Sequence, residues 1–199
     1  MILSFLTLKG GQGKTTLALN FAFEYKRQGL NVCLVDADNQ LSLFDFMTHR
    51  QEKSFCDFYK YESIEQLQEL NQQYDLIIID NSPRINEVID EIIACSDLIL
   101  IPTKLDMFSF WANVELAKKL KAQNKDMAFI VNMVKHYQGK LKNEFAEGLE
   151  KLEVPVLRQK ISDSNDYNKA LNELKTLAEI KSPKVAEIQL IIQELKEGV

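Results

Sequence analysis

The chain has 199 residues, a length that suits one domain with a substantial buried core. Apolar residues make up 46% and charged residues 27% of the sequence, which argues against a disordered or fibrous chain. The formal net charge is −5, so the chain as a whole is not an obvious nucleic-acid binder. The charge is uneven, because residues 135–184 hold ten Lys/Arg against eight Asp/Glu, a local balance of +2.

The cysteines and the start of the chain bear on the compartment. Cys33, Cys56 and Cys95 are scattered and show no metal-site spacing, a pattern typical of reduced thiols in a cytosolic protein. The apolar start is eight residues long, has no basic region before it and runs directly into Lys9, unlike a signal peptide. No apolar run is long enough to span a bilayer. We therefore expect a cytoplasmic protein without a stable membrane anchor.

Strand-like runs alternate with helical patterns along nearly the whole chain. The predicted strands cover residues 2–8, 31–36, 74–80, 97–102, 127–133 and 154–161. The predicted helices cover residues 13–28, 63–72, 85–95, 109–122, 138–151 and 183–197. Most strand runs are continuously apolar, as at 76–79, which indicates strands buried on both faces. The sequence therefore predicts an α/β fold: a doubly wound, mainly parallel sheet between helix layers, in a single domain over residues 1–199.

A glycine-rich turn separates the first strand from the first helix. Its glycines let backbone N–H groups close around phosphate oxygens, and the following helix points its positive dipole end at the same place. Lys14 adds a full charge, and the Thr15 hydroxyl can bind Mg²⁺. The residues expected to bind nucleotide phosphates are Gly10, Gly11, Gln12, Gly13, Lys14, Thr15 and Thr16.

Polar side chains also end the following predicted strands, where ligands of such sheets bind. Asp36 and Asp38 follow the second strand, Asp80 ends the third, and Asn132 lies in the fifth. An apolar strand that delivers one carboxylate beside a phosphate site suits Mg²⁺. The alternatives are an aspartate that only caps the next turn and an asparagine that only forms a turn.

The turn at residues 9–16 resembles the deviant Walker A loop of the ParA/MinD ATPases, which are P-loop NTPases. Their loop reads Lys-Gly-Gly-x-Gly-Lys-Ser/Thr, and its first lysine reaches across a dimer interface to the partner's nucleotide. The resemblance implies this role for Lys9, while Leu8 stands where a strict Walker A loop has glycine. A chance glycine-rich turn is the alternative interpretation.

Two further segments resemble the switches of that family. Residues 36–40 match its Asp-x-Asp-Pro-Gln segment except that Asn39 replaces the proline, which leaves the hydrolysis rate open. The resemblance implies that Asp38 positions or activates the attacking water and that Asp36 lies by Mg²⁺. Residues 80–84 resemble the second switch, so the implied metal site is Thr15, Asp36 and Asp80, and the implied catalytic residues are Lys9, Lys14 and Asp38.

Later landmarks resemble the family less closely. Asn132 matches an asparagine that reads the adenine edge in the MinD-like branch, and Ser109 holds a position where relatives often have Asp. Ser109 can also cap the helix that follows it. Trp111 and its neighbouring phenylalanines are expected in the core or on a dimer surface. The last helix is expected to pack on the core rather than bind lipid, because its acidic residues oppose anionic membranes.

The resemblance is closest to small plasmid-type ParA proteins. It implies a slow ATPase in which ATP and Mg²⁺ join two protomers face to face, a centromere-binding ParB-type adaptor that stimulates hydrolysis, and non-specific DNA binding by the dimer, hence association with the nucleoid. A ParA-like ATPase that positions cargo or a cell-pole complex is one alternative, and a metabolic ligase or amide synthase on the same scaffold is another. The candidate DNA contacts are Lys135, Lys140, Lys142, Arg158, Lys160 and Lys169.

Overall fold

The computed structural model describes residues 1–50, 53–83, 87–135, 147–149, 151 and 153–198. Six strands form one parallel sheet in the order β3-β2-β4-β1-β5-β6. The strands are β1 (Ile2–Phe5), β2 (Val32–Ala37), β3 (Asp57–Lys60), β4 (Leu76–Asn81), β5 (Leu98–Lys104) and β6 (Met127–Asn132). The helices are α1 (Lys14–Arg27), α2 (Ser42–His49), α3 (Ile64–Gln73), α4 (Glu87–Cys95), α5 (Met107–Ala122), α7 (Asn165–Asn172) and α8 (Val185–Glu197).

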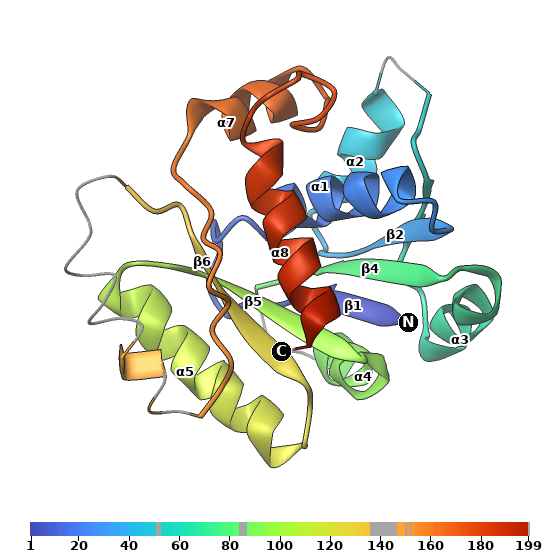
Figure 1. The fold of residues 1–199 in the computed structure, drawn as a ribbon. Helices are drawn as coiled ribbons and strands as arrows, with labels where there is room; N and C mark the ends of the chain where they lie inside the picture. The colour runs from blue at the N-terminus through green and yellow to red at the C-terminus, as the bar shows by residue number, and fades with distance from the viewer. Residues whose placement is uncertain (51–52, 84–86, 136–146, 150, 152, 199) are drawn as a thin grey trace.

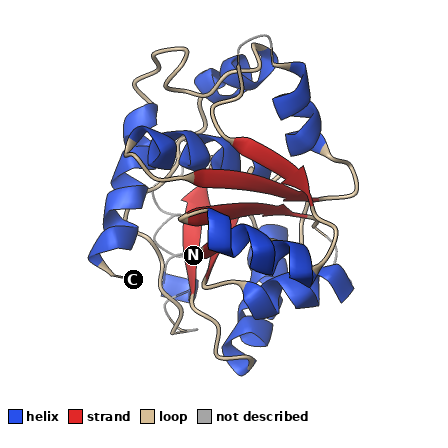
Figure 2. Cartoon of the chain, turned by 90° about the vertical axis from the view of Figure 1, so that its right-hand side faces the viewer, coloured by secondary structure: helices blue, strands red, loops and turns tan. Residues whose placement is uncertain are grey.

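Helices cover both faces of the sheet, as Figures 1 and 2 show. One apolar cluster joins the sheet to α1, α2, α7 and α8, and two others join it to α3, α4 and α5. The apolar strands supply both layers in alternation: Ile78 packs on the α1 side, while Ile77 and Ile79 pack on the α3 side. The predicted doubly wound α/β fold is confirmed. No helix within the described ranges is long and apolar enough to cross a membrane.

The strand register gathers polar residues at one edge of the sheet. Asp80 lies beside Phe5 of β1 and beside Asp36 of β2, so the two carboxylates end neighbouring strands. At the other side of β1, Lys104 of β5 lies beside Asn132 of β6. The turn after β1 therefore has carboxylates on one flank and a lysine and an amide on the other.

The predicted strand at 154–161 is wrong, although this segment runs alongside β6. Among the described residues the pairing consists of two isolated bridges, Phe129 to Val156 and Val134 to Ser162. The N–H groups of Leu157 and Ile161 still donate to β6 carbonyls, at 2.9 and 3.0 Å. The ladder is interrupted because the Gln159 N–H, which lies between those of Leu157 and Ile161 along the chain, donates to the Glu194 carboxylate on α8 at 3.1 Å instead of to β6. The predicted helix at 138–151 lies mostly outside the described residues, and only 147–149 of it is seen as helical.

The start of α5 also differs from the prediction. The helix begins at Met107, and its N-cap is Asp106, whose side chain accepts a hydrogen bond from the backbone N–H of Ser109 at 2.9 Å. Ser109 is therefore inside the first turn rather than its cap. Of the two positions expected for Trp111, the core is not observed, because Trp111 and Phe108 are 56% and 72% exposed, and the dimer surface stays a prediction.

A buried ion pair ties the end of α2 to the segment before α8. The side chain of Arg50 is 1% exposed and donates to Glu179 Oε1 at 2.5 Å and to the carbonyl of Leu174 at 3.1 Å. Its guanidinium also lies 5.0 Å from the centre of the Phe55 ring. Such a pair is costly to break, because the remaining partner would be a buried charge without a counter-ion.

Candidate functional site

The turn between β1 and α1 has the backbone geometry of an anion-binding loop. Gly11 and Gly13 take φ values of +71° and +89°, which side chains rarely adopt. A Cβ atom on Gly13 would lie 2.5 Å from Asn132 Nδ2, so only glycine fits there. α1 begins at Lys14, directly after the turn, and its unpaired first-turn N–H groups face the loop. Gly10 and Gly11 form the exposed rim of the loop.

Side chains from β6 and α5 hold this loop in place. Asn132 Nδ2 donates to the Gln12 carbonyl at 2.6 Å, while Asn132 Oδ1 accepts from the Met133 N–H at 2.8 Å. The buried Gln12 side chain accepts from the Lys104 N–H at 2.9 Å and donates to Ser109 Oγ at 2.9 Å. Sequence reasoning missed these supports. The adenine-reading role of Asn132 stays a prediction, with each end of its amide already bonded to the protein.

Lys14, Thr15 and Asp80 meet at the end of the loop. Lys14 is 7% exposed, and its burial lowers its pKa, although Asp80 and Asp38 act in the opposite direction. Thr15 Oγ1 donates to Asp80 Oδ2 at 2.5 Å. The other carboxylate oxygen, Asp80 Oδ1, is buried without a hydrogen-bond partner. A hydroxyl and a carboxylate with an unused oxygen, side by side at a phosphate loop, fit Mg²⁺.

The first predicted switch lies against the same site. Asp36 is buried, and its two oxygens accept from the backbone N–H groups of Asp38 and Phe44, both at 2.9 Å. Burial raises the pKa of Asp36, while these hydrogen bonds act against the rise. Asp38 is less buried and its Oδ1 accepts only from the exposed Gln40 N–H at 3.0 Å. Asp36 thus shapes the switch backbone, and Asp38 keeps an accessible carboxylate.

Lys9 does not join this group. Its Nζ donates to Asp106 Oδ1 at 3.0 Å and to Ser109 Oγ at 3.3 Å, and lies 5.6 Å from the centre of the Phe108 ring. The side chain therefore lies on the start of α5, and Lys14 supplies the buried ammonium group of the loop. Asp106 carried no signal in the sequence beyond its place three residues before Ser109.

A cavity of about 150 Å³ opens beside the loop, on the side of α7. It has both polar and apolar walls, which suits a nucleotide base. Among its lining residues are Gly13, Thr16, Asn132, Met133, Asp163 and Tyr167. The resemblance points to Asn132, and Asp163 and Tyr167 lie in the later part of the chain, which resembles the family less closely.

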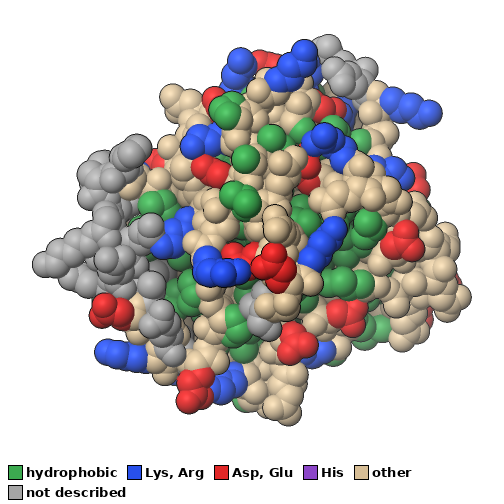
Figure 3. Space-filling model, in the orientation of Figure 1, with side chains coloured by type: hydrophobic (Ala, Val, Ile, Leu, Met, Phe, Trp, Pro, Cys, Tyr) green, Lys and Arg blue, Asp and Glu red, His purple; other side chains and the backbone are tan. Residues whose placement is uncertain are grey.

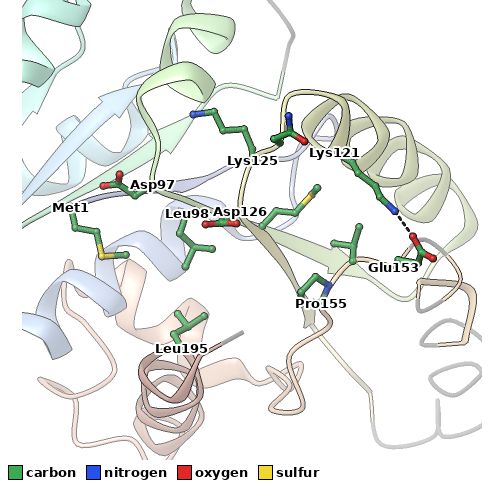
Figure 4. A pocket seen from close by; sticks show the side chains of 12 residues that line it. Met1, Asp97, Leu98, Lys121, Lys125, Asp126, Glu153, Pro155 and Leu195 are labelled. Atoms are coloured by element: carbon green, nitrogen blue, oxygen red, sulfur yellow. Dashed lines mark hydrogen bonds and ion pairs between the residues drawn. The ribbon is translucent and has the colours of Figure 1, made fainter.

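A larger cavity, of about 580 Å³, opens at the opposite end of the strands (Figure 4). It is lined by the residues that precede β1, β5 and β6, among them Met1, Asp97 and Asp126, so it lies far from the phosphate loop. Its lysines already have protein partners: Lys121 pairs with Glu153 at 2.6 Å, and Lys125 donates to the carbonyl of Ala94 at 2.6 Å. We therefore place the functional site at the loop, where the chemistry converges, and not at the larger opening.

Comparison with known proteins agrees with this geometry. Residues 3–177 match the family described as the CobQ/CobB/MinD/ParA nucleotide binding domain. The chain belongs to this family. The family match covers most of the chain, including the glycine-rich loop and the carboxylates of β2 and β4, so the loop is the candidate nucleotide site of this ParA/MinD-type protein.

Individual relatives are more distant. Protein virC1 of Rhizobium rhizogenes is 33% identical over 114 residues, which are 52% of this chain and 49% of virC1. The match thus spans about half the length of that relative. The maintenance of carboxysome distribution protein A of Halothiobacillus neapolitanus is 25% identical over 86% of this chain and 83% of its own. A plasmid partition protein of Borrelia burgdorferi, solved with AMPPNP, has the same fold, with a TM-score of 0.82 and 16% identity over 100% of this chain and 99% of its own.

Replacing Lys14 by Ala should weaken ATP binding by about 100-fold or more, because the loop loses its buried ammonium group. Calorimetric titration of ATP with Mg²⁺ measures this loss. The matched control is Lys118→Ala, which removes an exposed lysine that pairs with Glu115 on α5. ATP affinity equal to that of the wild type in the Lys14 variant would contradict the site.

Replacing Asp80 by Asn should stabilise the nucleotide-free protein at neutral pH. Burial raises the pKa of Asp80 from 3.8 to about 7, so the folded state resists the ionisation that the unfolded chain undergoes freely. The loss of folding stability that Asp80 causes grows between about pH 4 and pH 7 and is constant above about pH 7. It corresponds to about 4 kcal/mol at most.

Thermal melts at several pH values, without nucleotide or Mg²⁺, measure this effect. The difference in Tm between Asp80→Asn and the wild type should increase up to about pH 7, whereas the exposed Asp126→Asn control should show no such trend. A difference that does not depend on pH would mean that the Asp80 carboxylate is not held against ionisation.

Proposed function

We propose that this protein is an ATPase that segregates DNA, in which ATP and Mg²⁺ join two protomers and hydrolysis separates them. ATP phosphates would lie in the loop against Lys14 and the first turn of α1. Mg²⁺ would be held by Thr15 and Asp80 and would neutralise charge on the phosphates. Asp38 would accept a hydrogen bond from the attacking water and orient it.

The orientation of the Lys9 side chain is the observation that supports a dimer. A lysine inside the loop motif that contacted its own phosphates would be expected beside Lys14. Instead, its side chain is 39% exposed on the start of α5, within reach of solvent and of a second molecule. This supports the role in trans that the family resemblance implies. Membership of the nucleotide-binding family supports the ATP site itself.

DNA binding by this dimer is the finer part of the proposal. Figure 3 shows one face of the molecule, on which Lys and Arg are interspersed with Asp and Glu and do not gather into one basic patch. Of the candidate contacts, Lys140 and Lys142 lie outside the described residues, and Arg158 is paired with Glu194 and Glu197 at 3.3 and 3.6 Å. Lys169 is exposed on α7. DNA binding by one protomer would therefore be weak. Stronger binding would require the dimer, in which the surfaces of both protomers contact the DNA together.

A cargo-positioning ATPase is the second candidate. The supporting observation is the similarity to the carboxysome distribution protein, which extends over 86% of this chain. The two candidates share the nucleotide cycle and differ in what the dimer transports. A ParB-type adaptor belongs to the first candidate, and a cargo-bound adaptor belongs to the second.

Replacing Asp38 by Ala should leave ATP binding intact and slow hydrolysis by about 100-fold or more, because the water loses its hydrogen-bond acceptor. The variant should accumulate as an ATP-dependent dimer. Phosphate release and light scattering measure the two effects. Hydrolysis at the wild-type rate would show that another group orients the water.

The Asp38→Ala dimer also tests DNA binding. We expect non-specific binding that requires ATP and weakens steeply with salt, with a slope of about 0.9 for each phosphate contacted. Fluorescence anisotropy with two unrelated duplexes over a salt series measures it. A dimer that binds no DNA at low salt would favour the cargo-positioning candidate, and binding that is equal without ATP would contradict the switch.

Replacing Lys9 by Ala should leave ATP bound to a monomer, since the Lys9 side chain bonds to the start of α5 and Lys14 supplies the buried ammonium group of the loop. Light scattering with AMPPNP and Mg²⁺ measures the mass, and calorimetry measures the affinity. The matched control is again Lys118→Ala. A stable nucleotide-dependent dimer of the Lys9 variant would refute the role in trans.

A further inference from the structure

The Lys9 side chain is held by a compact set of groups at the start of α5. Asp106 accepts from Lys9 through Oδ1 at 3.0 Å and from the Ser109 hydroxyl through Oδ2 at 2.6 Å. Ser109 is fully buried and also accepts from Gln12 of the phosphate loop. Asp106 is itself fixed, because it caps α5 through the Ser109 N–H. Both partners of Lys9 are thus rigid.

We propose that Asp106 is a positioning residue that holds Lys9 within its own protomer, and that Lys9 must leave Asp106 before two protomers can join around ATP. This inference rests on the proposed function, because it assumes that Lys9 acts on the nucleotide of the partner. Two of the three N–H donors of the Lys9 ammonium group are directed to Asp106 and Ser109 of its own α5, so phosphate oxygens that bind this group across an interface would have to replace these acceptors. The Lys9–Asp106 pair therefore competes directly with dimer assembly.

The charge on Asp106 persists under ordinary conditions. Burial opposes its ionisation, but the hydrogen bonds from Ser109 and Lys9 outweigh burial and lower the pKa of Asp106. The pair is nevertheless easy to open, because the side chains of Lys9 and Asp106 are 39% and 40% exposed. Exposed pairs of this kind contribute little stability and are screened by salt. The hold is strong enough to orient the lysine and weak enough to be exchanged for a phosphate.

The surroundings place this exchange at an exposed apolar surface. Phe108 lies next to the Lys9 ammonium group, and Trp111 packs edge-on against Phe108 with ring centres 6.0 Å apart. Met107 on the same turn is 54% exposed. A second protomer that drew Lys9 away from α5 would approach this surface, so the release of Lys9 and the burial of these side chains would occur together.

The variant Asp106→Asn separates the two roles of Asp106. Asparagine caps helices as well as aspartate does, so α5 keeps its N-cap, while the counter-ion of Lys9 is lost. Asp106→Ser is a second variant that keeps a capping oxygen and removes the carboxylate. The matched control is Asp90→Asn, which removes a carboxylate of α4 that pairs with Lys119 of α5. Thermal melts of all four proteins verify that they fold.

Amine labelling of the nucleotide-free protein tests the contact itself. We expect Lys9 to be modified faster in Asp106→Asn and Asp106→Ser than in the wild type or Asp90→Asn, as measured by mass spectrometry of the peptide that contains it. A Lys9 labelling rate that is unchanged in both Asp106 variants would overturn the assignment. This readout does not depend on whether a dimer forms.

Titration of protein concentration with AMPPNP and Mg²⁺ tests the competition. With one pair opened in each protomer, Asp106→Asn should lower the dimer dissociation constant by about 2- to 20-fold at low salt, and by less at high salt. Faster labelling with an unchanged dissociation constant would overturn the competition. Faster labelling without any AMPPNP-dependent dimer, in the wild type or the variants, would confirm the hold of Asp106 on Lys9 and refute the proposed dimer.

Discussion

The phosphate loop between β1 and α1 must expose its backbone N–H groups to a ligand while the rest of the turn stays fixed, and the other parts of the site are arranged around this constraint. A glycine-rich turn is inherently loose, because glycine loses more conformational freedom on folding than any other residue. Here the loop is held from behind by Asn132 and from the side by Gln12, whose side chain bonds to β5 and α5. These contacts fix the loop through a carbonyl and a side chain and leave its backbone N–H donors available, which is the preorganisation that anion binding requires.

The same edge of the sheet carries an electrostatic imbalance. The charges of Asp36 and Asp38 both help to raise the pKa of Asp80, and Lys14 is the buried cation beside them. Asp80 has an oxygen without a partner at the centre of this group. A divalent cation would balance the negative charge of the carboxylates, and phosphates would balance the positive charge of Lys14. Ligand binding and the stability of the folded state are therefore coupled through Asp80.

The sequence predicted the fold and the loop because both depend on local patterns. Continuous apolar runs such as 76–79 identify buried strands, and the glycines and lysines of the loop are consecutive. What it missed depends on contacts between distant residues. The segment 154–161 has strand-like composition, but Glu194 on α8 binds the Gln159 N–H group that a continuous strand would need. The contact of Lys9 with Asp106 joins residues 97 positions apart, and no local pattern indicates it.

The anchoring of α2 limits how the first switch can respond to a nucleotide. α2 is held near its start by the Phe44 N–H on Asp36, and just after its end by the Arg50–Glu179 pair, so it cannot move far as a rigid rod. Leu41, immediately before the helix, has a left-handed φ of +52°, which is unfavourable for leucine. A displacement of Asp38 has therefore to be absorbed within residues 37–41. The backbone of residues 37–41 would take up such a displacement, while α2 stays tied to the C-terminal half of the protein through the Arg50–Glu179 pair.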